Sequence, residues 1–221
     1  MRVARSFDAS MSSQKDYPIA AATDIKKDQL VKLVGGLVVL AAVGETAAIL
    51  GVSEENHTGT ADTFNQRNNG TVIRVSDAPT TVFEAPAPRV TATSGSTTTM
   101  AATGVASMAD DDFNGGFMKL VSKVAASTNT DSIGTVYPIT DYTNSSRTFT
   151  TTKTAGGAVT AGDVFEIYPP NGFGKGNIDS GISKLVLTAT AALPIRSYGE
   201  DIDRGLTYHI PSLHINGSKQ S

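Results

Sequence analysis

The stretch LVKLVGGLVVLAAVGETAAILGV, residues 30–52, decides the fold because it is the most apolar part of the chain. Its longest run without a charge, Leu33 to Gly44, has about a dozen residues, whereas a helix that crosses a bilayer needs about 20. A buried helix would carry Gly35, Gly36 and Gly44 in its interior, and each glycine would cost roughly 1 kcal/mol there. The stretch is therefore too short for a membrane span and poorly suited to a helix.

The same glycines favour a β structure. Residues 29–34 and 37–43 are two apolar runs that Gly35 and Gly36 separate, which is the pattern of a two-residue β-hairpin turn. A third apolar run, residues 47–53, follows after a short turn. We therefore predict three short strands of a buried β core in this stretch rather than a helix.

Strand patterns continue along the chain, with turn residues between them. In TVIRVS, residues 71–76, Ile73 and Val75 lie on one face of an alternating strand. Pro86 and Pro88 remove two backbone donors and mark a sheet edge or a domain boundary. Further strands are expected within residues 115–125, 134–142, 145–152, 162–170, 182–191 and 206–215. The predicted fold class is all-β, with small β-barrel or sandwich modules, an extended N-terminal arm and little helix.

These patterns divide the chain into four segments. Residues 1–17 have few core-forming side chains and are expected to form an extended N-terminal arm. Residues 18–88 are expected to form a β-barrel-like domain that residues 178–221 could complete, and residues 89–170 a second small β-domain. Residues 171–221 are expected to form a C-terminal connector with strands.

Composition limits the chemistry that the chain can perform. The chain has no cysteine, which excludes disulfides, zinc-thiolate sites and thiol catalysis. Charged residues make up 18% of the chain and the formal net charge is −3, so nothing attracts it generally to nucleic acid. The N-terminal sequence lacks the apolar segment of a secretory signal. We expect synthesis and assembly in a cytoplasm, with neither nucleic acid nor a membrane as a partner.

The residues that most often carry chemistry are scattered. His57, His209 and His214 have no neighbouring cluster of Asp, Glu or His, and we expect them to pack at the surface or at an interface rather than bind a metal. Asp110–Asp112 lack the glycine and the distal glutamate of an EF-hand loop. We expect these aspartates to form a solvated turn before a strand.

Two further candidates are also weak. Asp201 and Asp203 are expected to lie in another solvated turn. GFGKGN, residues 172–177, lacks the Ser or Thr of a Walker motif and the helix that follows a Rossmann motif, which indicates a hinge or turn. We therefore predict no catalytic, cofactor or metal site, no cofactor and no enzymatic activity.

One part of the sequence is similar to a known class of virion protein. The segments Lys27–Val31, Gly35-Gly36 and Ile49–Val52 resemble the β-rich modules of tailed-bacteriophage head decoration proteins, also called capsid cement proteins. Those modules commonly read Lys-x-Gly-Asp-x-Val, then Gly-Gly, then an apolar strand and Ile-Leu-Gly-Val. Asp28-Gln29 stands here where the modules have Gly-Asp.

A second part resembles a small β-domain of phage virion proteins, including head and tail-fibre components. Its outline is Asp-Asp-x-x-x-Gly-Gly, a strand, Ile-Thr-x-Tyr, Thr-x-Thr and Ala-Gly-Asp-x-Phe-x-Ile. Residues 97–125, 139–152 and 161–170 match this outline. Both resemblances rest on turn-and-strand patterns, and together they cover more than half of the chain.

The resemblance implies a structural virion protein that binds the outer surface of an assembled phage capsid and stabilises it, often as a trimer at symmetry axes. Its partners would be the major capsid protein and further copies of itself, and repeated contacts would hold through multivalency. Arg2, Arg5 and Phe7 of the arm are the candidate contacts to the capsid or a neighbouring subunit, because arginine pairs with carboxylates through two hydrogen bonds. The alternative is an arm that is disordered until it binds.

Two other functions stay open. A phage tail or head-fibre adaptor shares the second resemblance, but it would be expected to lead into a longer fibre or triple-helical repeats. A carbohydrate-binding or hydrolytic β-protein usually presents aromatic platforms and, for hydrolysis, two carboxylates. This chain has 6% aromatic residues and no tryptophan. The sequence therefore favours the decoration protein, located on the virion.

Overall fold

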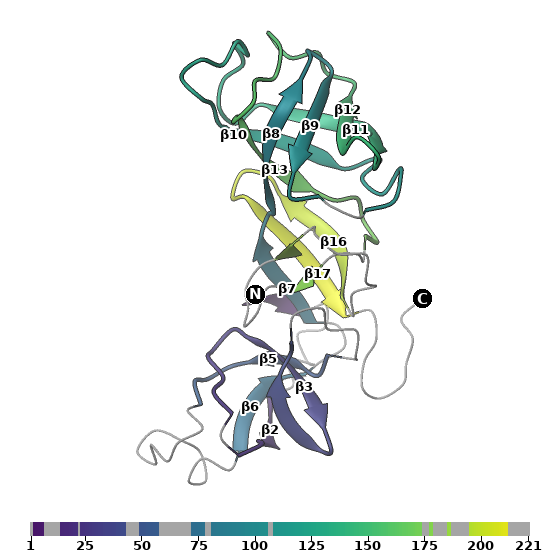
Figure 1. Ribbon diagram of the computed structural model, residues 1–221. Helices are drawn as coiled ribbons and strands as arrows, with labels where there is room; N and C mark the ends of the chain where they lie inside the picture. Colours follow the sequence, from purple (N-terminus) through teal and green to yellow (C-terminus); the bar gives the residue numbers. More distant parts are fainter. Residues whose placement is uncertain are drawn as a thin grey trace.

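Strands make up the regular structure of the described residues. The computed structural model describes residues 2–6, 14–21, 23–42, 49–57, 72–77, 81–105, 108–173, 177–178, 185–186 and 195–211. These residues form seventeen strands and contain no helix. Figure 1 shows three β units in a row, with a closed barrel at one end, a four-stranded sheet in the middle and a five-stranded sheet at the other end. The prediction of an all-β fold is confirmed.

The five-stranded sheet contains three strands from the apolar stretch. Its strands, in the order β2-β6-β5-β3-β4, are β2 (Gln14–Pro18), β3 (Leu30–Val34), β4 (Leu37–Leu40), β5 (Gly51–Ser53) and β6 (Val72–Ser76). Gly35 and Gly36 have φ angles of 59° and 83° and connect β3 to β4, so that Val34 pairs with Leu37. The predicted hairpin is confirmed, and β5 pairs with β3 on the side away from β4.

The two edges of this sheet meet. Ile19, directly after β2, forms a parallel bridge with Val38 of β4, and the Ala20 amide donates to the Val38 carbonyl at 3.1 Å. The sheet therefore curls around an apolar core of its own, against which Tyr17 and Leu33 also pack. That core consists of Ile19, Ile25, Val31, Val38, Leu50, Ile73 and Val75.

The closed barrel lies at the other end of the molecule. Its strands are β8 (Arg89–Gly95), β9 (Thr99–Thr103), β10 (Phe117–Ser122), β11 (Val136–Thr143), β12 (Thr148–Thr151) and β13 (Val164–Tyr168). Met118 and Leu120 alternate into its interior, as their spacing predicts. The Phe113 ring packs edge-on against Tyr142 with 4.8 Å between centroids and lies 5.1 Å from Phe149. A barrel of this size is filled by its own side chains.

A four-stranded sheet joins the two ends and is called the linking sheet. Its order is β1-β7-β17-β16, with β1 (Arg2–Ser6), β7 (Thr81–Pro86), β16 (Ile195–Asp201) and β17 (Leu206–Pro211). Two short strands, β14 (Asn177–Ile178) and β15 (Leu185–Val186), pair with each other. Only Ala87 and Pro88 separate β7 from β8, so the chain passes directly from the linking sheet into the barrel.

The segments differ in part from those expected. Residues 1–17 contribute β1, which pairs with β7, and most of β2, which pairs with β6. An edge strand needs only backbone partners on one side, so a scarcity of core-forming side chains does not prevent pairing. Residues 18–88 are divided between two sheets, and β16 and β17 join β7 in the linking sheet.

Truncation of a ring in the barrel tests its contribution to stability. Phe149→Ala should lower the free energy of unfolding by about 3–5 kcal/mol, because the lost ring leaves a cavity beside Phe113 and Tyr142. Ile133→Ala removes an apolar side chain that is 63% exposed and should change that free energy by less than about 0.5 kcal/mol. Urea unfolding followed by circular dichroism measures both variants. Equal losses would contradict the assignment of Phe149 to the core.

Candidate functional site

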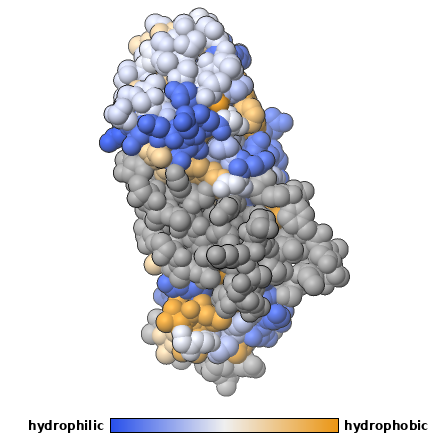
Figure 2. All heavy atoms as spheres, turned by 90° about the vertical axis from the view of Figure 1, so that its right-hand side faces the viewer, coloured by the Kyte–Doolittle hydropathy of each residue, from blue (hydrophilic) through white to orange (hydrophobic). Residues whose placement is uncertain are grey.

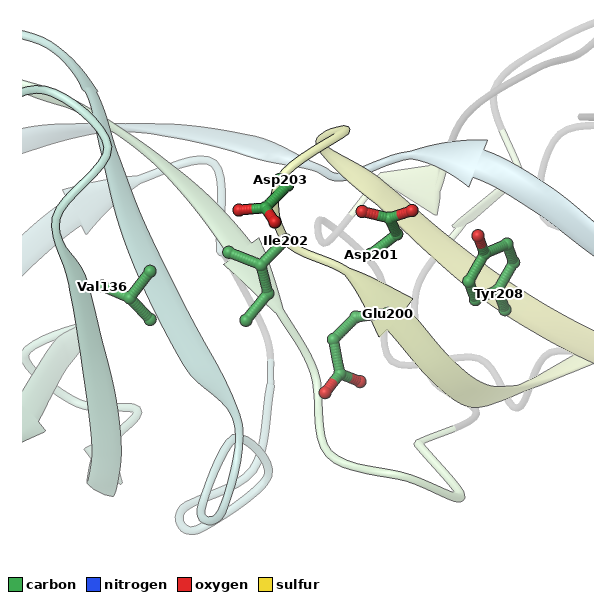
Figure 3. A pocket seen from close by; sticks show the side chains of 6 residues that line it. All are labelled: Val136, Glu200, Asp201, Ile202, Asp203 and Tyr208. Atoms are coloured by element: carbon green, nitrogen blue, oxygen red, sulfur yellow. The ribbon is translucent and has the colours of Figure 1, made fainter.

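A pocket of about 610 Å³ lies where the hairpin of β16 and β17 meets the barrel (Figure 3). Three carboxylates give it negative charge, while two aliphatic side chains and a tyrosine ring supply apolar surface. One carboxylate, Asp201, forms a partly exposed pair with Arg204 at 3.8 Å, which is a weak interaction in water. The pocket therefore favours cationic over anionic groups. Its lining residues are Val136 of β11 and Glu200, Asp201, Ile202, Asp203 and Tyr208 of the hairpin.

The turn between β16 and β17 rests on the rim of the barrel. The Ile202 carbonyl accepts a hydrogen bond from Lys119 Nζ at 2.5 Å and lies 3.3 Å from the Tyr168 hydroxyl, whose one proton it shares with Glu166. The Ala87 amide donates to the Gly205 carbonyl at 2.9 Å. The bonds to Ile202 fix the hairpin against the barrel and so set the distance between the two walls of the pocket, while the bond to Gly205 continues the pairing of β7 with β17.

A buried carboxylate lies directly beneath this turn. Glu166 of β13 is 5% exposed and accepts two hydrogen bonds from Arg89, at 2.9 Å from Nη2 and 3.2 Å from Nε. The Tyr168 hydroxyl donates to its other oxygen at 2.8 Å. Burial raises the pKa of Tyr168 above its usual value, and the hydrogen bond to Glu166 raises it further, so the hydroxyl stays a donor at neutral pH.

A second buried carboxylate, Asp163, lies next to β13 between two loops of the barrel. It accepts hydrogen bonds from the Val124 amide at 3.1 Å, the Ser127 hydroxyl at 2.8 Å and the Thr160 amide at 3.1 Å. Both of its oxygens are therefore occupied by donors from neighbouring loops. This arrangement holds the loops together and leaves the carboxylate poorly placed to take a proton from a substrate.

The histidines occupy different places from those expected. His57 and His209 are 5% and 1% exposed, so the expectation of a surface or interface position is wrong for both. His57 Nδ1 lies 3.0 Å from the Thr23 carbonyl, and His209 Nε2 lies 2.9 Å from the Thr207 hydroxyl. His214 lies outside the described residues. Within the described ranges, no three Asp, Glu, His or Cys side chains gather in a way that could hold a metal.

The acidic turns are present where the sequence places them. Asp110 accepts from the Asn144 amide and Asp112 from the Ala109 amide, each at 2.7 Å, which confirms a turn before β10. Asp201 ends β16, and Asp203 is exposed in the turn that follows. In GFGKGN, Gly172 lies in a turn with a φ of 83°, and residues 174–176 lie outside the described residues.

The candidate contact residues are described only in part. Arg2 and Arg5 belong to β1, whose backbone pairs with Glu84 and Val82 of β7 at these positions. Phe7 lies outside the described residues. A contact role for these three residues stays a prediction.

Sequence reasoning missed an exposed apolar pair at the tip of the hairpin of β3 and β4. Val34 and Leu37 are directly paired and are 55% and 40% exposed. Figure 2 shows hydrophobic surface over the end of the molecule that the five-stranded sheet forms. The only signal in the sequence was position, because residues next to a two-residue turn lie at strand ends, where the core no longer covers them.

Comparisons with protein-family models, with curated proteins and with solved structures found no match for this chain. Where residues are described, no helix is long and apolar enough to cross a bilayer.

His209 should make stability depend on pH. Burial lowers the pKa of His209 to about 4 from an ordinary value of 6.5. The unfolded chain therefore binds a proton below pH 6.5 that the folded chain does not bind until about pH 4. The free energy of unfolding should be highest above this window and should fall by up to about 3 kcal/mol as the pH is lowered through it.

His209→Gln can still donate a hydrogen bond to Thr207 but cannot titrate. Urea unfolding from pH 7.5 to 4 should therefore show a smaller loss of stability for this variant than for the native chain. Since carboxylates also titrate in this range, the difference between the two chains is the relevant quantity. An identical pH dependence would show that His209 does not contribute to it.

Proposed function

We propose that this chain is a structural virion protein that binds the outer surface of an assembled phage capsid as a homotrimer and stabilises the capsid. The observation that carries the proposal is the exposed pair of Val34 and Leu37. This pair flanks Gly35-Gly36, which is one of the segments that resemble decoration proteins. An apolar surface held on a rigid hairpin is suited to contact with another protein.

The arrangement of the β units supports this proposal. The five-stranded sheet has its own core, and Leu30, Ala41, Ile49 and Val52 belong to the same buried cluster as the interior of the barrel. A cement protein must resist deformation between the shell subunits that it connects, and close packing provides this stiffness. Contact with the major capsid protein would be repeated at every site on the shell, so each contact needs only modest affinity.

The N-terminal strand provides a second proposed contact. β1 is an edge strand of the linking sheet, and its other edge has no partner strand among the described residues. Arg2 and Arg5 of this strand would pair with carboxylates of the capsid or of a neighbouring subunit, and Phe7 would follow them along the chain.

A tail or head-fibre adaptor is the second candidate, and one observation favours it. Figure 1 shows the β units in a row rather than around a common centre. Such a shape would suit a connector that holds one protein at each end.

Purified particles test the proposal. Mass spectrometry should detect the chain in virions from the genome that encodes it, and a particle reconstruction should show its density spread over the outer surface of the shell. Density confined to the tail or to isolated spikes would instead support the adaptor. Absence of the chain from the particle would contradict both functions.

The hairpin tip can be tested on heads that lack the protein. Val34→Thr combined with Leu37→Thr keeps β-compatible side chains but removes the exposed apolar surface. Binding should weaken by about tenfold or more, because burial of such side chains contributes about 1.5–3 kcal/mol each. Ile133→Thr, at the exposed apolar residue of the barrel, is the matched control and should bind as the native chain does.

Co-sedimentation with the heads measures the binding, and urea unfolding shows that each variant is folded. Equal binding by the double variant and the native chain would remove the hairpin tip from the contact.

A further inference from the structure

Among the described residues, two chain segments connect the barrel to the linking sheet besides the β16–β17 turn, and Ala85 of β7 also belongs to the same buried cluster as the barrel interior. The first is the direct passage from β7 to β8 through Ala87 and Pro88. The second is Phe173, whose ring stacks on Phe113 with 5.4 Å between centroids. Its carbonyl accepts from the Ser197 amide of β16 at 2.7 Å.

The β16–β17 turn supplies a further connection. Its two carbonyls, on Ile202 and Gly205, accept hydrogen bonds from Lys119, Tyr168 and Ala87. Lys119 and Tyr168 belong to β10 and β13 of the barrel, whereas Ala87 belongs to the segment that leads from β7 into the barrel. The turn is therefore held from two strands of the barrel and from this connecting segment.

At Gly205 the turn packs closely against the Glu166 carboxylate. It has a φ of 68°, and a Cβ atom built there would lie 3.3 Å from both carboxylate oxygens of Glu166. Arg89 and Tyr168 hold that carboxylate in place, so it cannot easily move away from an added Cβ atom. A residue other than glycine would therefore meet both backbone strain and a crowded neighbour.

We propose that the β16–β17 turn is a clasp that fixes the orientation of the barrel on the linking sheet, and that the acidic pocket exists only while the clasp is closed. The pocket has one wall from β11 of the barrel and the other from the hairpin, so rotation of the barrel separates its walls. This inference does not depend on the virion role.

Two pairs of variants test the clasp. Gly205→Ala crowds Glu166, whereas Gly134→Ala is the control, since Gly134 also has a positive φ of 97° but nothing lies within 4 Å of an added Cβ. Lys119→Met removes a donor to Ile202, whereas Lys123→Met is its control, since Lys123 bonds to Asn129 and Asp131 within the barrel.

Backbone ¹⁵N relaxation of the full-length chain gives the readout, because it reports the tumbling of the barrel and of the linking sheet separately in one molecule. The native chain and both controls should show one common tumbling time. Gly205→Ala and Lys119→Met should show faster tumbling of the barrel, and the Ala87 amide should exchange with solvent about tenfold faster or more.

The proposal is overturned if the native barrel already tumbles independently, or if Lys119→Met keeps both the common tumbling time and the slow Ala87 exchange. If Gly205→Ala disturbs the barrel itself, the amide spectrum of this variant will show it. In that case the result for Lys119→Met tests the proposal. All of these measurements use the free protein, so a failure of the clasp is distinguishable from a failure to bind capsids.

Discussion

The pairing of β7 with β17 is the interaction on which the arrangement of the three β units depends. β7 leads into the barrel, and β17 carries the turn that contacts the barrel rim. The Thr207 hydroxyl donates to the Ala85 carbonyl across 122 residues of chain, and the intervening segment includes the whole barrel. Loop-closure entropy rises only slowly with length, so a folded unit between two pairing strands adds little to the cost of bringing them together.

The parts of the fold that could be predicted are those with a local physical cause. Gly35 and Gly36 demand a turn because both adopt positive φ, and Met118 and Leu120 face inward because side chains alternate along a strand. The pairing of β7 with β17 has no local cause. It depends on which distant edge is free once each unit has folded, and a single sequence does not contain that information.

The candidate sites also divide into those that have a local physical cause and those that do not. The turn at Asp110–Asp112 could be predicted because its aspartates cap neighbouring amides over short distances. The burial of His209 could not be predicted, because its cover comes from strands that meet only in the tertiary structure. The acidic pocket could not be predicted from the sequence for the same reason, since Val136 and Asp203 belong to different units. A polar residue in a strand pattern does not reveal which side of the sheet will be covered.

The first and last strands of the barrel are neighbours, since Arg89 of β8 is paired with Glu166 of β13. The chain therefore enters and leaves the barrel at one place, beside the linking sheet. Recombination could remove this unit or replace it with another whose ends lie equally close, while every strand pair of the other two sheets is preserved. Such a chain can acquire a new module in one genetic step, and afterwards selection has to refit the residues that meet the β16–β17 turn and the buried cluster that the barrel shares with the rest of the chain.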